Sequence, residues 1–402
     1  MTRAGLLPLP AEPTLPGDSM PPRSPRPTSA RVPLPLTPER LVARVEAEGT
    51  PLVDPVPGRP GRRIVTFAWL ADEPCTSVTL VANKLTDLSD PADTDLVPVP
   101  GIDGAWSASY EVAADWRASY LFVPNPGEAC RDPRNPRTIA SKFDIGDLSI
   151  AAMPEAPAVG PWARRPGVAA GNVEVHRARS NALDGERDVW IARAGASLDQ
   201  PAERVLVLFD GEVWARVLPI LPLLDNLVAD GTIPPTLVVM IDSLGPQRRE
   251  AELTCRDAMI DLAVEWTARA AERSGTPLHP STTVIAGQSL GGLAAAYAVL
   301  TRPEVFGRAL CQSPSLWWPS RPGEEEWLTR AYATAPPAPR RLSLQVGTDE
   351  WVLIEPVHRL AATLREHGEA GCELVDLHTF AGGHDHACWQ AALAPGLIPL
   401  LR

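Results

Sequence analysis

The sequence has almost no lysine, no closely spaced cysteine pair and no long apolar run. Of its 37 lysine and arginine residues only Lys84 and Lys142 are lysine, and the other 35 are arginine. The formal net charge is −12 and runs of basic residues are missing, which argues against nucleic acid or an anionic membrane as the main partner. The six cysteines form no CxxC pair and no Cys/His group at metal spacing, so we expect reduced thiols, no bound metal and no cofactor.

Targeting and membrane-spanning segments are missing as well. A secretory signal needs an uninterrupted apolar stretch of about 7 to 15 residues, but prolines interrupt the apolar residues 6–10. No run approaches the roughly 18 apolar residues of a membrane span. We therefore expect a soluble protein of the cytoplasm, with neither nucleic acid nor a membrane as its partner.

Proline is abundant and unevenly placed. The chain has 45 prolines in 402 residues, and eleven of them fall in residues 1–38, which have no periodic apolar pattern and are expected to be a disordered tail. Thr37 and Pro38 predict the cap and first turn of a short helix. Residues 39–150 contain β-branched and aromatic segments separated by Gly, Pro, Asp and Asn, which predicts a β-sandwich. Further prolines in residues 151–170 indicate a semi-rigid linker.

Residues 171–402 follow a different pattern, in which short apolar strands alternate with helical stretches. Strands, the first two as an antiparallel pair, are expected at 174–176, 187–191, 204–209, 237–241, 282–286, 342–346 and 373–380. Helices are expected at 214–229, 257–273 and 292–300. Such alternation indicates an α/β domain with a mainly parallel sheet covered on both faces.

The strongest chemical signal is a Gly-x-Ser-x-Gly motif centred on Ser289. It follows a predicted strand and precedes a predicted helix, which is the setting in which an α/β hydrolase holds its serine on a strained turn. Gly287 and Gly291 are needed because side chains at the flanking positions would collide. We therefore expect Ser289 to be a nucleophile.

A serine nucleophile needs a base and an acid, which in the α/β-hydrolase order lie further along the chain. His384 follows the last predicted strand in a glycine loop and is the expected base, whereas His386 is expected to be a packing or surface residue. The acid should follow the last strand but one, where Asp349 and Glu350 stand side by side. Spacing alone does not separate these two carboxylates.

The same chemistry needs backbone N–H groups that stabilise the developing oxyanion. One is expected from Leu290, the residue after the nucleophile, at the start of a helix. The second is expected from the loop after the strand at 204–209, where Gly211 or Glu212 would donate.

These segments resemble the enterochelin (enterobactin) esterases, cytoplasmic serine hydrolases that cleave the ester bonds of iron-loaded catecholate siderophores. The specific motifs are Asp-Gly-Glu-Val-Trp, Arg-x-x-Glu-Leu, Gln-Ser-Pro-Ser-Leu-Trp-Trp and Gly-His-Asp-His, and the matching segments are 115–124, 132–136, 209–215, 241–242, 249–253, 287–292, 312–319 and 383–389. The resemblance implies an immunoglobulin-like N-terminal domain that helps cover the substrate, followed by an α/β-hydrolase catalytic domain.

The resemblance also implies roles for single residues. The acidic position of the family matches Glu350 better than Asp349. Arg249 and Glu252 match residues that line the pocket beside the serine, although an ion pair that holds the loop explains them almost as well.

Aromatic and arginine side chains are further candidates for substrate contacts. Trp214 and Trp318, together with Trp317, could stack on catechol rings or simply pack in the core. The loop at 124–131 is shorter than in many family members, which leaves the identity of the siderophore open. Arginines beside this loop, at 131, 134 and 137, could meet anionic catecholates or only solvate the loop.

Together these features predict a two-step acyl transfer on a ferric catecholate siderophore. Ser289 would attack an ester carbonyl with His384 as general base, and water would then release the acyl product. Iron would be cargo that is released in the cytoplasm. The alternatives are a serine esterase for a feruloyl or sugar ester, with the β-sandwich as a carbohydrate-binding module, and a catalytically silent siderophore-binding protein.

Overall fold

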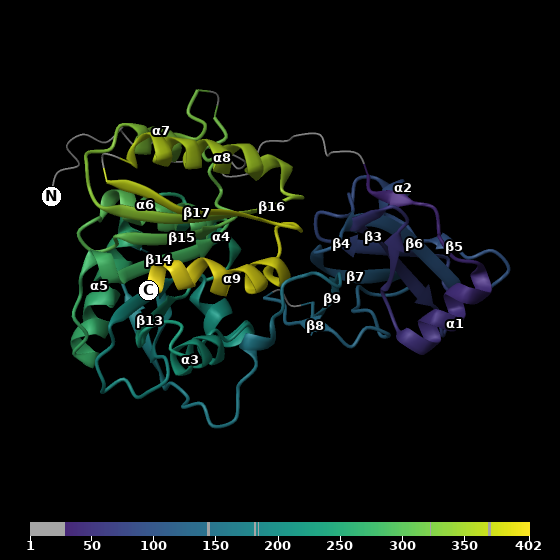
Figure 1. Ribbon diagram of the computed structural model, residues 1–402, viewed down its shortest axis with the longest axis horizontal. Coiled ribbons are helices and arrows are strands. Elements are labelled where there is room, and N and C mark those ends of the chain that lie inside the picture. Colours follow the sequence, from purple (N-terminus) through teal and green to yellow (C-terminus); the bar gives the residue numbers. More distant parts are fainter. Residues whose placement is uncertain (1–28, 143–144, 181, 184, 322, 369–370) are drawn as a thin grey trace.

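The computed structural model describes residues 29–402, apart from 143–144, 181, 184, 322 and 369–370 (Figure 1). Most of the tail expected at 1–38 therefore lies outside the described residues. The folded part starts before the expected end of the tail at residue 38, because β1 (Arg31–Val32) pairs antiparallel with Tyr110 and Ser109. Arg31 also donates to the carbonyl oxygens of Ala92 and Asp95, each at 2.6 Å. These bonds join residues of the expected tail to the folded N-terminal part.

The N-terminal part consists of two antiparallel sheets. The first has the order β1-β6-β3-β2, with β5 also paired to β6, and the second has the order β4-β7-β9-β8. The elements are α1 (Pro38–Glu48), β2 (Leu52–Val56), β3 (Arg59–Leu70), β4 (Ser77–Ala82), α2 (Pro91–Thr94), β5 (Val97–Pro98), β6 (Ala105–Ala113), β7 (Arg117–Asn125), β8 (Thr138–Ile139) and β9 (Leu148–Ala152). Aromatic side chains from both sheets share one buried core, in which Phe67 meets Tyr120 edge to face with ring centroids 4.8 Å apart.

Helix α1 begins as the sequence predicts. The Thr37 hydroxyl accepts a hydrogen bond from the Arg40 N–H at 3.4 Å, and Pro38 occupies the first turn, where a missing N–H costs nothing. Leu41 and Val45, four residues apart, are the buried side chains of the helix.

The connection between the two parts is packed against the C-terminal part. Its short helix η1 (Gly160–Trp162) contacts α3 (Leu221–Ala229). The Asn226 side chain on α3 donates to the carbonyl oxygens of Pro161 and Ala163, both at 2.8 Å. Strand β9 extends to Ala152, so the start expected for the linker at residue 151 falls inside this strand.

The C-terminal part is built around one eight-stranded sheet with helices on both faces (Figure 1). The strand order is β10-β11-β13-β12-β14-β15-β16-β17; β10, β11 and β13 pair antiparallel and the remaining neighbours pair parallel. The strands are β10 (Val173–Arg179), β11 (Glu186–Arg193), β12 (Arg204–Leu208), β13 (Thr236–Ile241), β14 (Thr283–Gln288), β15 (Arg308–Gln312), β16 (Arg340–Gly347) and β17 (Cys372–Phe380).

The two faces of this sheet carry different helices. Alternate residues of β12 enter opposite buried clusters, because successive side chains of a strand point to opposite faces. One cluster includes residues of α5 (Asp257–Ser274), α6 (Leu290–Thr301), α7 (Trp327–Ala333) and α8 (Trp351–Glu366), and the other includes residues of α3 and α9 (His386–Leu401). Across the described ranges, no helix is long and apolar enough to cross a bilayer.

Two predicted elements differ from the structure. The strand β15 was not predicted, although it lies inside the sheet, between β14 and β16. The single helix expected at 214–229 is two elements, the π-helix η2 (Val213–Val217) and α3. Pro219 lies between them, and its fixed φ and missing N–H prevent a continuous helix.

Candidate active site

The serine motif forms a sharp turn between β14 and α6. Ser289 stands between the two elements with φ 59° and ψ −120°, a strained conformation for a residue with a side chain. A Cβ on Gly287 would lie 2.3 Å from the carbonyl oxygen of Gly291. The turn is therefore possible only with glycine at position 287, and it presents the Ser289 side chain at the end of the strand.

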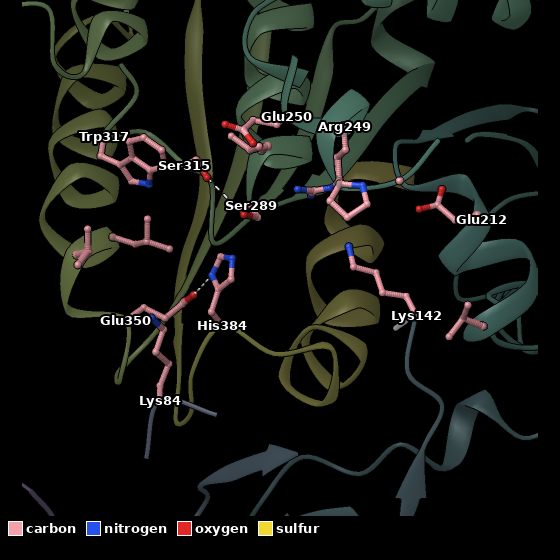
Figure 2. Close-up of a pocket in the computed structure, with 16 residues that line it drawn as sticks. Lys84, Lys142, Glu212, Arg249, Glu250, Ser289, Ser315, Trp317, Glu350 and His384 are labelled. Atoms are coloured by element: carbon pink, nitrogen blue, oxygen red, sulfur yellow. Dashed lines mark hydrogen bonds and ion pairs between the residues drawn. The ribbon is translucent and has the colours of Figure 1, made fainter. Parts of the chain in front are cut away.

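A histidine and a buried carboxylate lie next to this turn. Nδ1 of His384 is 2.5 Å from Oε1 of Glu350, whose side chain is fully buried. The second carboxylate oxygen of Glu350 accepts from the Ser313 hydroxyl at 2.7 Å and from the Gly347 N–H at 2.5 Å. Figure 2 shows the His384 ring between Glu350 and Ser289. Because Nδ1 faces the carboxylate, Nε2 is the ring nitrogen left for chemistry at the serine.

The neighbouring acidic residues have other partners. Oδ2 of Asp349 accepts from the Trp116 indole N–H at 2.8 Å, so this carboxylate is turned toward the N-terminal part. Asp385 caps α9 by accepting from the Ala387 N–H at 2.9 Å, and its burial raises its pKa. The His384 ring is hydrogen-bonded to Glu350.

His386 is a packing residue. Its ring lies against Trp389 and Trp214, with centroid distances of 5.0 and 6.4 Å. Burial lowers the pKa of His386 to about 3, so the imidazole is neutral over the physiological pH range.

The two expected backbone donors follow neighbouring strands. Leu290 is the first residue of α6, where N–H groups have no partner within the helix. Gly211 follows β12, which pairs parallel with β14, so the two chain segments leave the sheet at the same edge. A Cβ on Gly211 would lie 2.4 Å from the Ile241 nitrogen, and this close approach to β13 requires glycine.

Ser289, His384 and Glu350 line one cavity of about 490 Å³. This volume lies within the roughly 300–1,000 Å³ of small-molecule sites. Trp317 forms part of the same wall, and the Ser315 hydroxyl lies 3.4 Å from the Ser289 hydroxyl. The cavity therefore has the size and the reactive groups of a site for a small organic ester.

Arg249 lines the cavity and holds the turn before the serine. Its guanidinium donates to both carboxylate oxygens of Asp210 at 2.6 and 2.8 Å and to the carbonyl oxygen of Gln288 at 2.9 Å. Burial alone would raise the pKa of Asp210, but the Arg249 guanidinium holds it well below its usual range. Arg249 thereby links the ends of β12 and β14.

Three residues expected to bind substrate need correction. Glu252 is 6 % exposed and accepts from Arg187 at 2.7 and 3.0 Å, so it is half of a buried ion pair. Trp214 is 1 % exposed and donates to the Gln288 side chain at 3.2 Å. Trp318 is 3 % exposed within the main core cluster. None of the three is among the described residues that line the cavity, because each is held in the core behind its wall.

Sequence reasoning missed Lys84 and Lys142 and considered Glu212 only as a backbone donor. The side chains of all three residues line the cavity, and Figure 2 shows Lys142 on the same side of it as Glu212. Burial, followed by repulsion from Asp210, raises the pKa of Glu212 to about 7. The rarity of lysine was a signal that could have pointed to these residues, since Lys84 and Lys142 are the only two lysines of the chain.

The N-terminal part contacts the histidine loop directly. The Arg117 N–H donates to the Ala381 carbonyl oxygen at 3.0 Å, and Arg117 forms a parallel bridge with Gly382. A Cβ on Gly382 would lie 2.5 Å from the Arg117 carbonyl oxygen. Strand β7 thus runs along the loop that carries His384.

Two family profiles match the chain. One is described as putative esterase and matches residues 180–400, and the other is described as enterochelin esterase, N-terminal, and matches residues 64–131. The iron(III) enterobactin esterase of Dickeya dadantii is 33 % identical over 402 aligned residues, which cover 88 % of this chain and 90 % of the relative. The iron(III) salmochelin esterase of Escherichia coli is 30 % identical, with 88 % and 91 % covered.

Solved structures agree with these matches. The ferric enterobactin esterase of Salmonella typhimurium superimposes with a TM-score of 0.77 at 28 % identity, covering 89 % of this chain and 98 % of that one. The enterobactin esterase of Shigella flexneri, crystallised in the presence of enterobactin, gives a TM-score of 0.75 at 27 % identity, with 89 % and 97 % covered. The chain has an α/β-hydrolase-like esterase fold and belongs to the enterochelin (enterobactin) esterase family.

Proposed function

We propose that this protein hydrolyses the ester bonds of ferric catecholate siderophores of the enterobactin type. The observation that carries the proposal is the position of Ser289, on a strained turn beside the His384–Glu350 pair and at the wall of a cavity. The names of the relatives supply the substrate class, since they are esterases of iron(III) enterobactin and iron(III) salmochelin.

The proposed reaction has two acyl-transfer steps. The Ser289 hydroxyl attacks an ester carbonyl while Nε2 of His384 takes the hydroxyl proton, and Glu350 stabilises the resulting imidazolium. Backbone N–H groups of Leu290 and Gly211 stabilise the tetrahedral oxyanion. The leaving alcohol takes the proton from His384, and water, activated by the same histidine, then cleaves the acyl-enzyme.

Ester cleavage would loosen the hold of the siderophore on iron. The trilactone ring holds three catecholates close to one another. Once the first catecholate binds Fe(III), the other two therefore bind at high effective concentration. Hydrolysis removes that preorganisation and lowers the affinity for iron. Iron is therefore cargo of the substrate in this proposal, and its release would take place in the cytoplasm.

We also propose that residues 29–152 form an immunoglobulin-like sandwich domain and residues 173–402 the catalytic domain. The two antiparallel sheets with a shared aromatic core support this division. Lys84 and Lys142, both from the first of these regions, line the cavity, which supports a role for the N-terminal domain in covering the substrate.

The proposal is tested with ferric enterobactin and a feruloyl ester, with products analysed by mass. We expect Ser289→Ala to lower hydrolysis of the ferric trilactone by at least about 10³-fold, while Ser281→Ala, at an exposed serine, does not. A fluorophosphonate probe should label the unaltered protein and not the Ser289→Ala variant. Faster turnover of the feruloyl ester would indicate a different esterase, and a folded protein that takes no label would indicate a silent binding protein.

A further inference from the structure

Both lysines of the chain line the catalytic cavity. The sixteen described residues that line it include Lys84 and Lys142, although these sixteen are a small fraction of the 402-residue chain. The other 35 of the 37 lysine and arginine residues are arginine. The preference for arginine over lysine in the rest of the sequence therefore does not extend to these two positions in the cavity that contains Ser289.

The two lysines reach the cavity from separate points of the N-terminal part. Lys84 follows β4, and Lys142 lies between β8 and β9. In Figure 2, Lys84 lies on the side of Glu350 and His384, whereas Lys142 lies on the side of Arg249 and Glu212. Ser289 and His384 therefore lie between two ammonium groups. Both ammonium groups come from the N-terminal part, and neither has a role in the proposed acyl transfer.

The surroundings of the two ammonium groups differ. The Lys84 ammonium lies 4.8 Å from the ring centroid of Trp351, a cation–π contact at the edge of the cavity. Lys142 is half-buried, and its burial lowers its pKa, while the charges of Asp210 and Glu212 oppose that shift. The Arg249 guanidinium beside Lys142 is bound by the Asp210 carboxylate through two hydrogen bonds, and the lining also contains the carboxyl groups of Glu212 and Glu250.

Lysine suits this position better than arginine for a physical reason. Its ammonium is a compact point charge on a flexible four-carbon stem, whereas a guanidinium is a planar fork that matches a carboxylate or phosphate. A bulky chelate with charge spread over many oxygens offers no single planar partner. A point charge on a four-carbon stem on each side of the cavity can attract such a ligand while its ester is presented to Ser289.

We infer that Lys84 and Lys142 bind the negative charge of an anionic ferric tris-catecholate on opposite sides of its reacting ester, and so select the iron-loaded substrate. This inference rests on the proposed function. Three doubly deprotonated catecholates around one Fe(III) leave a charge of 3−. The iron-free ligand carries less negative charge, since phenolic hydroxyls ordinarily titrate near pH 10. The lysines would thus discriminate by charge, whereas the catalytic groups act on either form.

The inference predicts a substrate-selective effect on KM. We expect Lys84→Met and Lys142→Met each to raise KM for the ferric trilactone roughly tenfold, about the effect of one partly screened ion pair, with kcat changed less than about twofold. The ratio of this KM to that for a neutral p-nitrophenyl ester should rise by a similar factor. Lys84→Arg and Lys142→Arg, which keep the charge, should recover part of the loss. Added salt should raise the ferric KM of the unaltered protein more than that of the double Met variant.

Arg40→Met is the matched control, because it removes one exposed positive charge from helix α1 of the same N-terminal part. Its KM for the ferric trilactone should stay unchanged. Equal losses on the ferric and neutral substrates in the lysine variants would overturn the inference, and so would an unchanged ferric KM.

A binding measurement separates this inference from the proposed function. Tryptophan quenching by the ferric chelate is compared between Ser289→Ala and the same variant carrying Lys84→Met and Lys142→Met. Weaker binding in the triple variant supports the lysine site even where the unaltered enzyme fails to cleave the trilactone. Equal affinity in the two proteins contradicts it, whatever the hydrolysis assay shows.

Discussion

The side-chain amide of Asn83 donates a hydrogen bond to the main-chain carbonyl of His384 at 3.0 Å, although the two residues are 301 positions apart. The next residue of the loop contacts the same part of the protein, since the Asp385 carboxylate accepts from the Ser119 N–H, and the Ser119 carbonyl oxygen accepts from the Asn83 N–H at 3.1 Å. A Cβ on Gly383 would lie 2.5 Å from Cβ of Lys84. The N-terminal part therefore forms one wall of the loop that carries the proposed base.

Removing the Asn83 amide should reduce catalysis more than substrate binding. We expect Asn83→Ala to lower kcat on a neutral p-nitrophenyl ester roughly fivefold, because one hydrogen bond of about 1 kcal/mol that orients His384 is lost, with little change in KM. Thr79→Val is the control, since it removes a hydrogen bond of 2.8 Å to Asp95 within the N-terminal part. If both variants lower the melting temperature equally and both keep full kcat, the Asn83 contact has no role in positioning.

The two adjacent carboxylates should differ sharply when each is replaced by its amide. Glu350→Gln should lower kcat roughly 10³- to 10⁴-fold, because an amide at this position no longer orients and stabilises the protonated His384. Asp349→Asn should retain most activity, since its carboxylate contacts Trp116 rather than the histidine. Steady-state kinetics at one pH are sufficient. The assignment is wrong if the Asp349 variant is the less active of the two.

Removing one partner of the Arg249–Asp210 ion pair should lower the free energy of unfolding more than replacing both partners. Arg249→Met leaves the buried Asp210 carboxylate without its main partner, so we expect a loss of roughly 3–5 kcal/mol in the free energy of unfolding. Adding Asp210→Asn should recover a large part of that loss, because the uncompensated charge is removed. Urea denaturation of the single and double variants measures the coupling. Additive losses would show that the two side chains stabilise the fold independently.

Glu212 should make stability fall as the pH rises toward neutrality. Its pKa is raised from 4.5 to about 7 in the folded protein, so between these values the folded state binds more protons than the unfolded chain. The free energy of unfolding therefore decreases from about pH 4.5 to pH 7 and levels off above it. Glu212→Gln removes this penalty and should stabilise the protein by roughly 3 kcal/mol at pH 8, with almost no gain at pH 4.5.

Urea denaturation of both proteins at the two pH values measures this difference. The amide oxygen introduced by Glu212→Gln would still accept from the Ser243 N–H, which the carboxylate binds at 3.1 Å. A Glu212→Gln variant that is less stable at pH 8 would contradict the prediction.

Local patterns were sufficient for much of the fold and for the strained turn that carries Ser289. The turn at Ser289 depends on a strand, two glycines and a helix within ten residues, so its geometry could be read from sequence. The pairing of Val175 with Trp190 in β10 and β11 also follows from a local antiparallel pattern. Strand β15 was missed because its five residues, from Arg308 to Gln312, show no alternation and no strong β-branched run.

Roles that depend on which wall a side chain faces were not predictable. Trp317 and Trp318 are adjacent and alike in sequence, and both belong to the main core cluster, yet of the two only Trp317 is among the described residues that line the cavity. Glu252 lies three residues after Arg249, but it pairs with Arg187 on β11 instead of facing the site. Arg249 and Glu252 both lie on α4 (Pro246–Leu253), so which partner each side chain meets depends on how this helix packs against the rest of the C-terminal part.

The sequence by itself determined the nucleophile turn and the order of serine, acid and histidine along the chain, because those features depend on backbone conformation over a few residues. The spacing of residues left Glu350 and Asp349 open and the resemblance favoured Glu350, but only the tertiary structure brings Glu350 to His384 and Lys84 and Lys142 to the cavity. It also brought Asn83 to the histidine loop. Contacts of this kind depend on how separate strands and sheets pack in space, and no local pattern of residues encodes which distant residues come together.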